Sequence, residues 1–270
     1  MPIHCSIPIR NLTQSEFDDR DNVVMRCAYA SQNGLGRMCD ERVYENDLAL
    51  RLRAEGMSNV FTQTPVTVTH DGFEKIYRLD LLADDAVYEL KTVAALVAQH
   101  DAQVFHYAML VAVNHAKLLN FRPGKVQGRL RFSVMMPAER RRLDWDDSGW
   151  RPMTRRCKTL HERLRLLMED WGGFLDTHLY EEALIHFSGG EAQIVRRLPI
   201  LRDGIELGTH TVNSHEPGLG FVVTSFQDSS HQRTHLQRLL DVTEMRALQW
   251  FNLNRATVEC VTLERSGQAK

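Results

Sequence analysis

Hydrophobic and polar positions in the first half of the chain follow two different periods. Apolar residues spaced three or four apart predict helices, and strict alternation predicts strands. His70-Asp71-Gly72 is a hairpin turn signal, and Asp84-Asp85 marks a second tight turn. The order of helices, three-stranded meander, helix and strand predicts an α/β domain with a mixed sheet. Residues 1–15 are predicted as an irregular arm. The predicted helices cover 16–32, 38–55 and 96–113, and the predicted strands cover 60–69, 76–83, 86–92 and 117–121.

The second half of the chain repeats this order at an offset of about 135 residues. The segment 180–184 (YEEAL) echoes 44–48 (YENDL), and Arg202-Asp203-Gly204 echoes the first turn signal. Duplication of one fold therefore predicts a domain over 1–125, a strand (129–135) and polar connector over 126–160, and a second domain over 161–270. The elements predicted there are a helix ending near 187, strands over 192–201, 205–214, 221–226 and 248–253, and a helix over 231–242.

The connector is dense in arginines and aspartates, with Trp145 and Trp150 between them. One interpretation is a solvated linker whose charges keep it soluble. The other is a surface that holds a nucleic-acid strand through basic side chains and stacking on the indoles.

Composition limits the possible classes of protein. At 270 residues, with 43% hydrophobic and 25% charged residues, the chain is typical of a soluble globular protein. No apolar run approaches the roughly 20 residues of a membrane span, so we expect no membrane partner and a cytoplasmic location. Five scattered cysteines without a CxxC pair argue against a disulfide framework and against a zinc site. A net charge of −2 gives no global sign of nucleic-acid binding.

Candidate chemistry lies in the stretch Tyr77–Thr92 (YRLDLLADDAVYELKT). Glu89 and Lys91 are two apart in a strand, so they share a face while Leu90 turns into the core. Asp80 lies on the neighbouring strand of the hairpin. A carboxylate pair with a lysine is what a hard divalent cation and an attacking water need. The alternative is that Asp80 caps a turn and that Glu89 and Lys91 form an exposed ion pair.

A second pair of acids, Glu41 and Glu45, shares one face of the second helix. They are either solvated helix charges or part of the same site. The second copy of the fold lacks counterparts of Asp80, Glu89, Lys91 and Gln103, which favours a site in the first half. The aligned positions are Asn213 for Asp80, Val222 for Glu89, Thr224 for Lys91 and His235 for Gln103.

The run Glu41-x-x-Tyr44-Glu45, then Asp80, then Glu89-Leu90-Lys91 and a helix with Gln103 resembles the PD-(D/E)XK nuclease superfamily, specifically the GxxExxY proteins. The resemblance covers residues 16–122. Met38 replaces the family's first glycine, and the hairpin from Asp80 to Glu89 is about one residue shorter than expected. The second half resembles a degenerate repeat without the nuclease triad.

The resemblance implies a restriction-endonuclease-like mixed sheet flanked by helices, duplicated into two similar domains. It implies Mg²⁺, with Mn²⁺ as a substitute, and nucleic acid as partner, with DNA favoured. The protein would be a monomeric pseudo-dimer or a homodimer. The implied metal ligands are Asp80, Glu89, the backbone carbonyl of Leu90, and Glu41, with Glu45 as the alternative to Glu41. Lys91 would act on the attacking water. Gln103 and Tyr107 would position a phosphate oxygen. The alternatives are a non-catalytic nucleic-acid- or protein-binding module and a structural subunit of a larger assembly.

Overall fold

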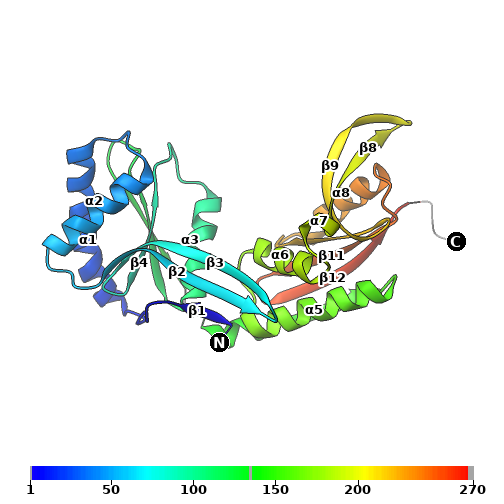
Figure 1. The fold of residues 1–270 in the computed structure, drawn as a ribbon, viewed down its shortest axis with the longest axis horizontal. Coiled ribbons are helices and arrows are strands. Elements are labelled where there is room, and N and C mark those ends of the chain that lie inside the picture. Colours follow the sequence, from blue (N-terminus) through cyan, green and yellow to red (C-terminus); the bar gives the residue numbers. More distant parts are fainter. Residues whose placement is uncertain (1, 134–135, 267–270) are drawn as a thin grey trace. The chain divides into compact units, whose positions relative to one another are not determined.

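The computed structural model describes residues 2–133 and 136–266. The chain forms two compact units, Met1–Pro137 and Ala138–Lys270. Each unit has a six-stranded mixed sheet flanked by helices (Figure 1). The predicted fold class is confirmed. None of the helices in the described part of the chain combines the length and apolar character that a membrane span requires.

The sheet of the first unit has the strand order β1-β2-β3-β4-β5-β6. Neighbouring strands are antiparallel except β4 and β5, which are parallel and are connected by helix α3. A parallel pair needs such a crossover, which explains why a helix follows β4. The elements are β1 (Ile3–Cys5), α1 (Gln14–Leu35), α2 (Glu41–Ala54), β2 (Val60–His70), β3 (Phe73–Ala83), β4 (Ala86–Lys91), α3 (Ala98–Leu110), β5 (His115–Asn120) and β6 (Gln127–Phe132). The short helix α4 (Pro137–Arg140) begins at the last residue of this unit and continues into the second.

Helices cover both faces of this sheet, with α1 and α2 on one side and α3 on the other (Figure 1). Tyr88 and Leu90 of β4 are fully buried in the core beneath α1 and α2, together with Phe17 and Tyr44. Because successive strand residues point to opposite faces, Glu89 projects from the other face of β4. Within the six residues of β4, the alternation thus places Tyr88 and Leu90 in the core and Glu89 and Lys91 on the side of the candidate site.

The second unit repeats this topology. Its strand order is β7-β12-β11-β10-β9-β8, and its parallel pair β10 and β11 is again connected by a helix, α8. Strands β8 to β12 correspond to β2 to β6, and β7 adds a parallel edge strand beside β12. The elements are β7 (Asp144–Gly149), α5 (Arg155–Trp171), α6 (Thr177–Phe187), α7 (Glu191–Ile194), β8 (Val195–Arg202), β9 (Ile205–Glu216), β10 (Leu219–Thr224), α8 (Ser229–Asp241), β11 (Ala247–Asn254) and β12 (Thr257–Glu264).

The repetition extends to individual hydrogen bonds. Helices α1 and α5 end at Gly36 and Gly172, with φ of 75° and 77°, a region that glycine occupies without steric cost. In each unit the hydroxyl of a buried tyrosine eight residues later, Tyr44 or Tyr180, donates to the carbonyl of that glycine. The same motif therefore joins the first helix to the second in both copies.

A buried asparagine is also repeated. Asn120 of β5 pairs with Lys91 and bonds both backbone groups of Val93, and Asn252 of β11 pairs with Thr224 and does the same for Phe226. These bonds hold the chain where it leaves the strand before the crossover helix. They also establish that Lys91 and Thr224 are equivalent positions, as the sequence predicts.

Two of the predicted pairings between the copies are shifted by one residue. Leu81 pairs with Tyr88, and Asn213 pairs with the equivalent Phe221, so the counterpart of Asp80 is Val212 rather than Asn213. Counting from the starts of α3 and α8, Gln103 corresponds to Thr234 rather than to His235. The second copy still lacks the counterparts of Asp80, Glu89 and Lys91, where it has Val212, Val222 and Thr224.

Several elements were not expected from the sequence, among them α4, α7 and β12. Residues 3–5, predicted as an irregular arm, form β1. The polar connector contains β7 and the start of α5, while the strand predicted over 129–135 is β6, which belongs to the first sheet. Position 134–135 of that prediction lies outside the described residues.

The hairpin between β3 and β4 turns through Asp84 and Asp85, both with positive φ. Several hydrogen bonds hold this turn: Asn59 and Asp84 bond through the Asn59 N–H to Asp84 Oδ1 and through the Asp84 N–H to the Asn59 carbonyl, Arg20 Nε donates to the Asp84 carbonyl, and the Arg10 N–H donates to Asp85 Oδ1. Because the loop has only two residues, Leu81 lies opposite Tyr88, and the next positions along the two strands are Asp80 and Glu89. The short hairpin thus sets the two candidate carboxylates side by side.

Candidate active site

Asp80, Glu89, Lys91 and Glu41 converge at one place in the first unit. Lys91 Nζ lies 2.6 Å from Glu89 Oε1 and 3.8 Å from Glu41 Oε1. The backbone N–H of Leu90, between Glu89 and Lys91, donates to Asp80 Oδ2 at 2.9 Å. Strands β3 and β4 and the start of α2 therefore supply one connected polar group.

Burial distinguishes this group from an ordinary surface ion pair. The Glu89 side chain is 3% exposed and that of Lys91 is 12% exposed. Burial, and then the adjacent Asp80 carboxylate, raise the pKa of Glu89 to about 8, although Lys91 acts in the opposite direction. The interpretation of Glu89 and Lys91 as an exposed ion pair is wrong.

Lys91 stays charged in this environment. Burial alone would lower its pKa, but Glu89, followed by Glu41 and Asp80, raises the pKa of Lys91 above its usual value. In the metal-free protein the side chain is consequently an ammonium group, which donates hydrogen bonds and carries positive charge.

Glu41 and Glu45 lie at the same cleft, which is lined by Glu41, Arg42, Glu45, Gln63 and Arg78. The Glu45 side chain is 2% exposed and forms an ion pair with Arg42. Burial is the main cause that raises the pKa of both carboxyls, and Asp80 raises both further. Glu45 is therefore not a solvated helix charge, and Glu41, at 37% exposure, is the more accessible of the two.

Gln63 is a member of this site that the sequence did not reveal. It stands opposite Asp80 between the ladder pairs Thr62–Leu81 and Thr64–Leu79, and its φ of 54° interrupts the ladder there. Its Nε2 donates to Glu45 Oε2 at 2.8 Å and reaches Asp80 Oδ1 at 3.3 Å. A left-handed conformation is costly for a residue with a side chain, and such strain gathers at functional sites. In the sequence, Gln63 is a glutamine among threonines in a strand, and this pattern indicates neither its backbone conformation nor its place in the site.

The third helix places Tyr107 beside these carboxylates. Burial is the largest cause that raises the pKa of Tyr107, and the charges of Glu89 and Asp80 raise it further. Gln103, one turn earlier, donates from Nε2 to the Tyr107 hydroxyl at 3.3 Å. Tyr107 thus lies within the field of the acids, and Gln103 contacts the site through it.

The donor set fits a hard divalent cation. Glu89 Oε2 is buried and has no hydrogen-bond partner among the residues that the structure describes. Two neighbouring carboxylates repel one another when both are ionised, and a divalent cation removes that repulsion. The Leu90 carbonyl as a further ligand stays a prediction. At the corresponding positions of the second unit, Val212, Val222 and Thr224 offer no carboxylate.

Comparison with known proteins bears on the first unit. Residues 18–132 match the family model of the PD-(D/E)XK nuclease superfamily. This match runs from α1 to β6 and includes every residue of the site described above, so it supports a nuclease-type function. No curated protein and no solved structure matches the chain. The GxxExxY family and the degenerate nature of the second copy stay predictions.

Proposed function

We propose that the first unit is a Mg²⁺-dependent nuclease of the GxxExxY type, which hydrolyses phosphodiester bonds of DNA at a single active site. The observation that carries this proposal is the Asp80–Glu89 pair, in which Glu89 is buried and Asp80 half-buried, with Lys91 between Glu89 and Glu41. A purely structural hairpin has no reason to set two acids side by side, bury Glu89, and leave its Oε2 without a partner among the described residues.

Asp80 and Glu89 would hold the cation, with Glu41 completing the set through water. When bound, Mg²⁺ supplies Lewis acidity and neutralises charge on the phosphate. As an ammonium group, Lys91 orients the attacking water and donates a hydrogen bond to a phosphate oxygen as negative charge develops there. The Tyr107 hydroxyl, held by Gln103, positions a second phosphate oxygen.

Gln63 and Glu45 act behind these groups as positioning residues. The Gln63 amide links Glu45 to Asp80 and so restricts the rotation of the Asp80 carboxylate. At the rim, the guanidinium groups of Arg42 and Arg78 line the cleft and are suited to backbone phosphates of a nucleic acid. The second unit contributes no catalytic group in this proposal.

The test uses the purified full chain with Mg²⁺ or Mn²⁺ and a panel of single-stranded, duplex and branched DNA, with RNA as a comparison. We expect metal-dependent cleavage by the wild type and by Lys125→Ala, whose side chain is exposed, and a loss of at least about 100-fold in Lys91→Ala. Equal cleavage by wild type and Lys91→Ala would refute the assigned role.

Calorimetric titration with Mg²⁺ distinguishes a nuclease site that binds metal from a non-catalytic binding module that does not. A competent site binds the cation, and Asp80→Asn abolishes that binding. Nucleic-acid binding without metal binding or cleavage would instead establish the non-catalytic module.

A further inference from the structure

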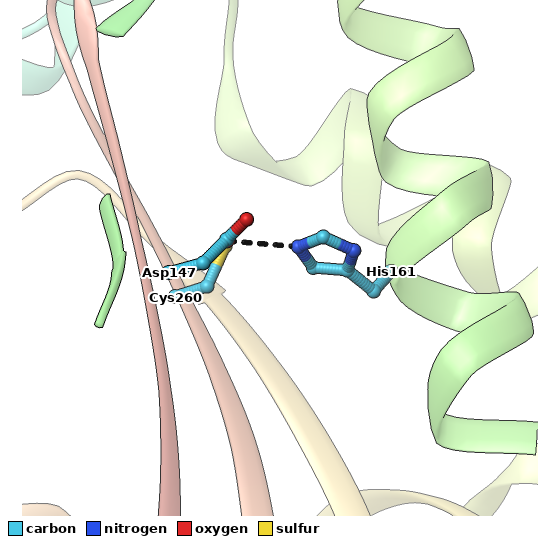
Figure 2. A group of neighbouring side chains, drawn as sticks. All are labelled: Asp147, His161 and Cys260. Atoms are coloured by element: carbon cyan, nitrogen blue, oxygen red, sulfur yellow. Dashed lines mark hydrogen bonds and ion pairs between the residues drawn. The ribbon is translucent and has the colours of Figure 1, made fainter. Parts of the chain in front are cut away.

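A second polar cluster lies in the second unit, far in sequence from the site above. It consists of Asp147 on β7, His161 on α5 and Cys260 on β12. Figure 2 shows the His161 imidazole pointing from its helix toward Asp147 and Cys260. His161 Nε2 lies 2.9 Å from Asp147 Oδ1, and one donor atom from each of the three residues lies within 4.8 Å of the others.

These donors are of a different kind from those of the first unit. Sulfur and imidazole nitrogen suit Zn²⁺ and similar borderline cations, whereas Mg²⁺ prefers oxygen. Three protein ligands leave a fourth tetrahedral position for water or another ligand. We propose that Asp147, His161 and Cys260 form a binding site for a thiophilic divalent cation such as Zn²⁺.

The duplicated fold provides an internal control for this cluster. Strand register equates Cys260, opposite Phe251, with Gly128, opposite Leu119, and the shared glycine caps of α1 and α5 equate His161 with Met25. A Cβ placed on Gly128 would lie 3.2 Å from Met25 Sδ, so these two positions are neighbours in the first unit as well.

At these two positions the first unit has a thioether and a glycine, beside the Lys117 side chain, where the second has an imidazole and a thiol. Asp147 comes from β7, and among the described residues of the first unit no strand occupies the corresponding place beside β6. All three ligands are thus additions in the copy that lacks the nuclease carboxylates. Since only the scaffold has to be kept in such a copy, a new convergence of three ligand types indicates a function of its own.

The neighbours of the cluster are suited to holding it in place. Arg165 forms an ion pair with Asp147 Oδ2, which leaves Oδ1 directed toward His161. Trp150 stacks on the imidazole of His161 with ring centroids 4.1 Å apart, and Trp145 lies against Arg165. Such outer partners orient ligands and limit the access of water to a metal site.

The absence of a CxxC pair argues against a zinc site, but a CxxC pair indicates only those metal sites whose ligands are close together in the sequence. Here the ligands come from three elements that the fold brings together. The competing explanation is that His161, Arg165 and Cys260 only satisfy the half-buried Asp147 carboxylate, with no cation involved.

Cobalt binding distinguishes these explanations. The purified, metal-free full chain is titrated with Co²⁺, and the thiolate-to-cobalt charge-transfer band is followed in the near ultraviolet. The nuclease-type site has no sulfur ligand and cannot produce this band. We expect a band that saturates at one Co²⁺ per chain, is displaced by Zn²⁺, and is unchanged in Asp80→Asn.

Variants assign the ligands. Cys260→Ser should lose the band, and His161→Gln, which keeps the thiol, should weaken apparent Co²⁺ affinity by at least about tenfold. Cys157→Ser is the matched control, because Cys157 is also a buried thiol beside a histidine, His215, in the same unit. It is not one of the three residues of the cluster. It should retain the band. Circular dichroism verifies that each variant is folded.

Absence of the band in the wild type, or its persistence in Cys260→Ser, would overturn the proposal. If Cys260→Ser does not fold, the wild-type titration and His161→Gln still decide the question.

Discussion

Replacing Glu89 by glutamine removes one titrating group from the buried centre of the first unit and keeps nearly the same shape. In the metal-free protein, burial and the Asp80 carboxylate raise the pKa of Glu89 to about 8. Glutamate in an unfolded chain titrates near about 4.3. Between these values the folded protein holds a proton that the unfolded chain has released, so the free energy of unfolding falls as pH rises.

The limiting slope for one proton is about 1.4 kcal/mol per pH unit. From about pH 5 to about pH 7 the wild type should therefore lose up to roughly 3 kcal/mol more stability than Glu89→Gln. The other charged groups that face Glu89, namely Asp80, Lys91 and Glu41, are present in both proteins. The difference between the two proteins consequently isolates Glu89.

The assay is urea unfolding in the presence of a chelator, at several pH values, followed by circular dichroism and by tryptophan fluorescence. All four tryptophans (Trp145, Trp150, Trp171 and Trp250) belong to the second unit, so their fluorescence is an internal control. The variant should equal the wild type at about pH 4, below the pKa of glutamate in the unfolded chain, and exceed it increasingly toward pH 8. The transition seen by fluorescence should not change.

With excess Mg²⁺ at neutral pH, the wild type should become more stable than Glu89→Gln, because the cation stabilises only the protein that binds it. A difference between Glu89→Gln and wild type that does not vary with pH would refute the reasoning.

Further predictions concern turnover, metal affinity and the repeated scaffold. Lys91→Ala should retain Mg²⁺ binding by calorimetry while cleavage falls at least about 100-fold. Gln63→Leu should weaken Mg²⁺ binding about 10-fold or more in the same titration, because Asp80 loses its amide partner. Tyr107→Phe should lower the cleavage rate and leave Mg²⁺ affinity unchanged, and an unchanged rate would exclude the hydroxyl from the site. Tyr44→Phe and Tyr180→Phe should each cost about 1–3 kcal/mol of unfolding free energy, since each leaves a glycine carbonyl without its donor. Only Tyr180→Phe should shift the tryptophan transition.

The helices and strands could be predicted from the sequence where apolar and polar residues alternate regularly, so that one face of the element is apolar and the other polar. This holds for β2, whose alternation is clear, and for the two turns that contain Asp-Gly. Strand β7 (DWDDSG) was missed because an edge strand has little need for apolar residues. Helix α5 had a usable signal in its buried residues, spaced three or four apart, which its many charges obscured.

The same distinction applies to the candidate site. Asp80, Glu89 and Lys91 could be placed together because they lie on adjacent strands of one short hairpin, where spacing determines the face. Gln63 could not be included, since its role depends on a left-handed backbone. The cluster around Cys260 depends on contacts between elements more than a hundred residues apart in the chain. Tertiary convergence of this kind leaves no local pattern.

The Asp84–Asp85 turn has a practical consequence for work with this protein. One of its bonds comes from the backbone of Arg10, in the segment before α1. Truncating that segment, or attaching a tag that displaces it, would loosen the turn that aligns Asp80 with Glu89 more than seventy positions away. Preparations that differ only at the amino terminus should then differ in metal affinity, so the boundaries of the expressed protein are themselves a variable of the assay.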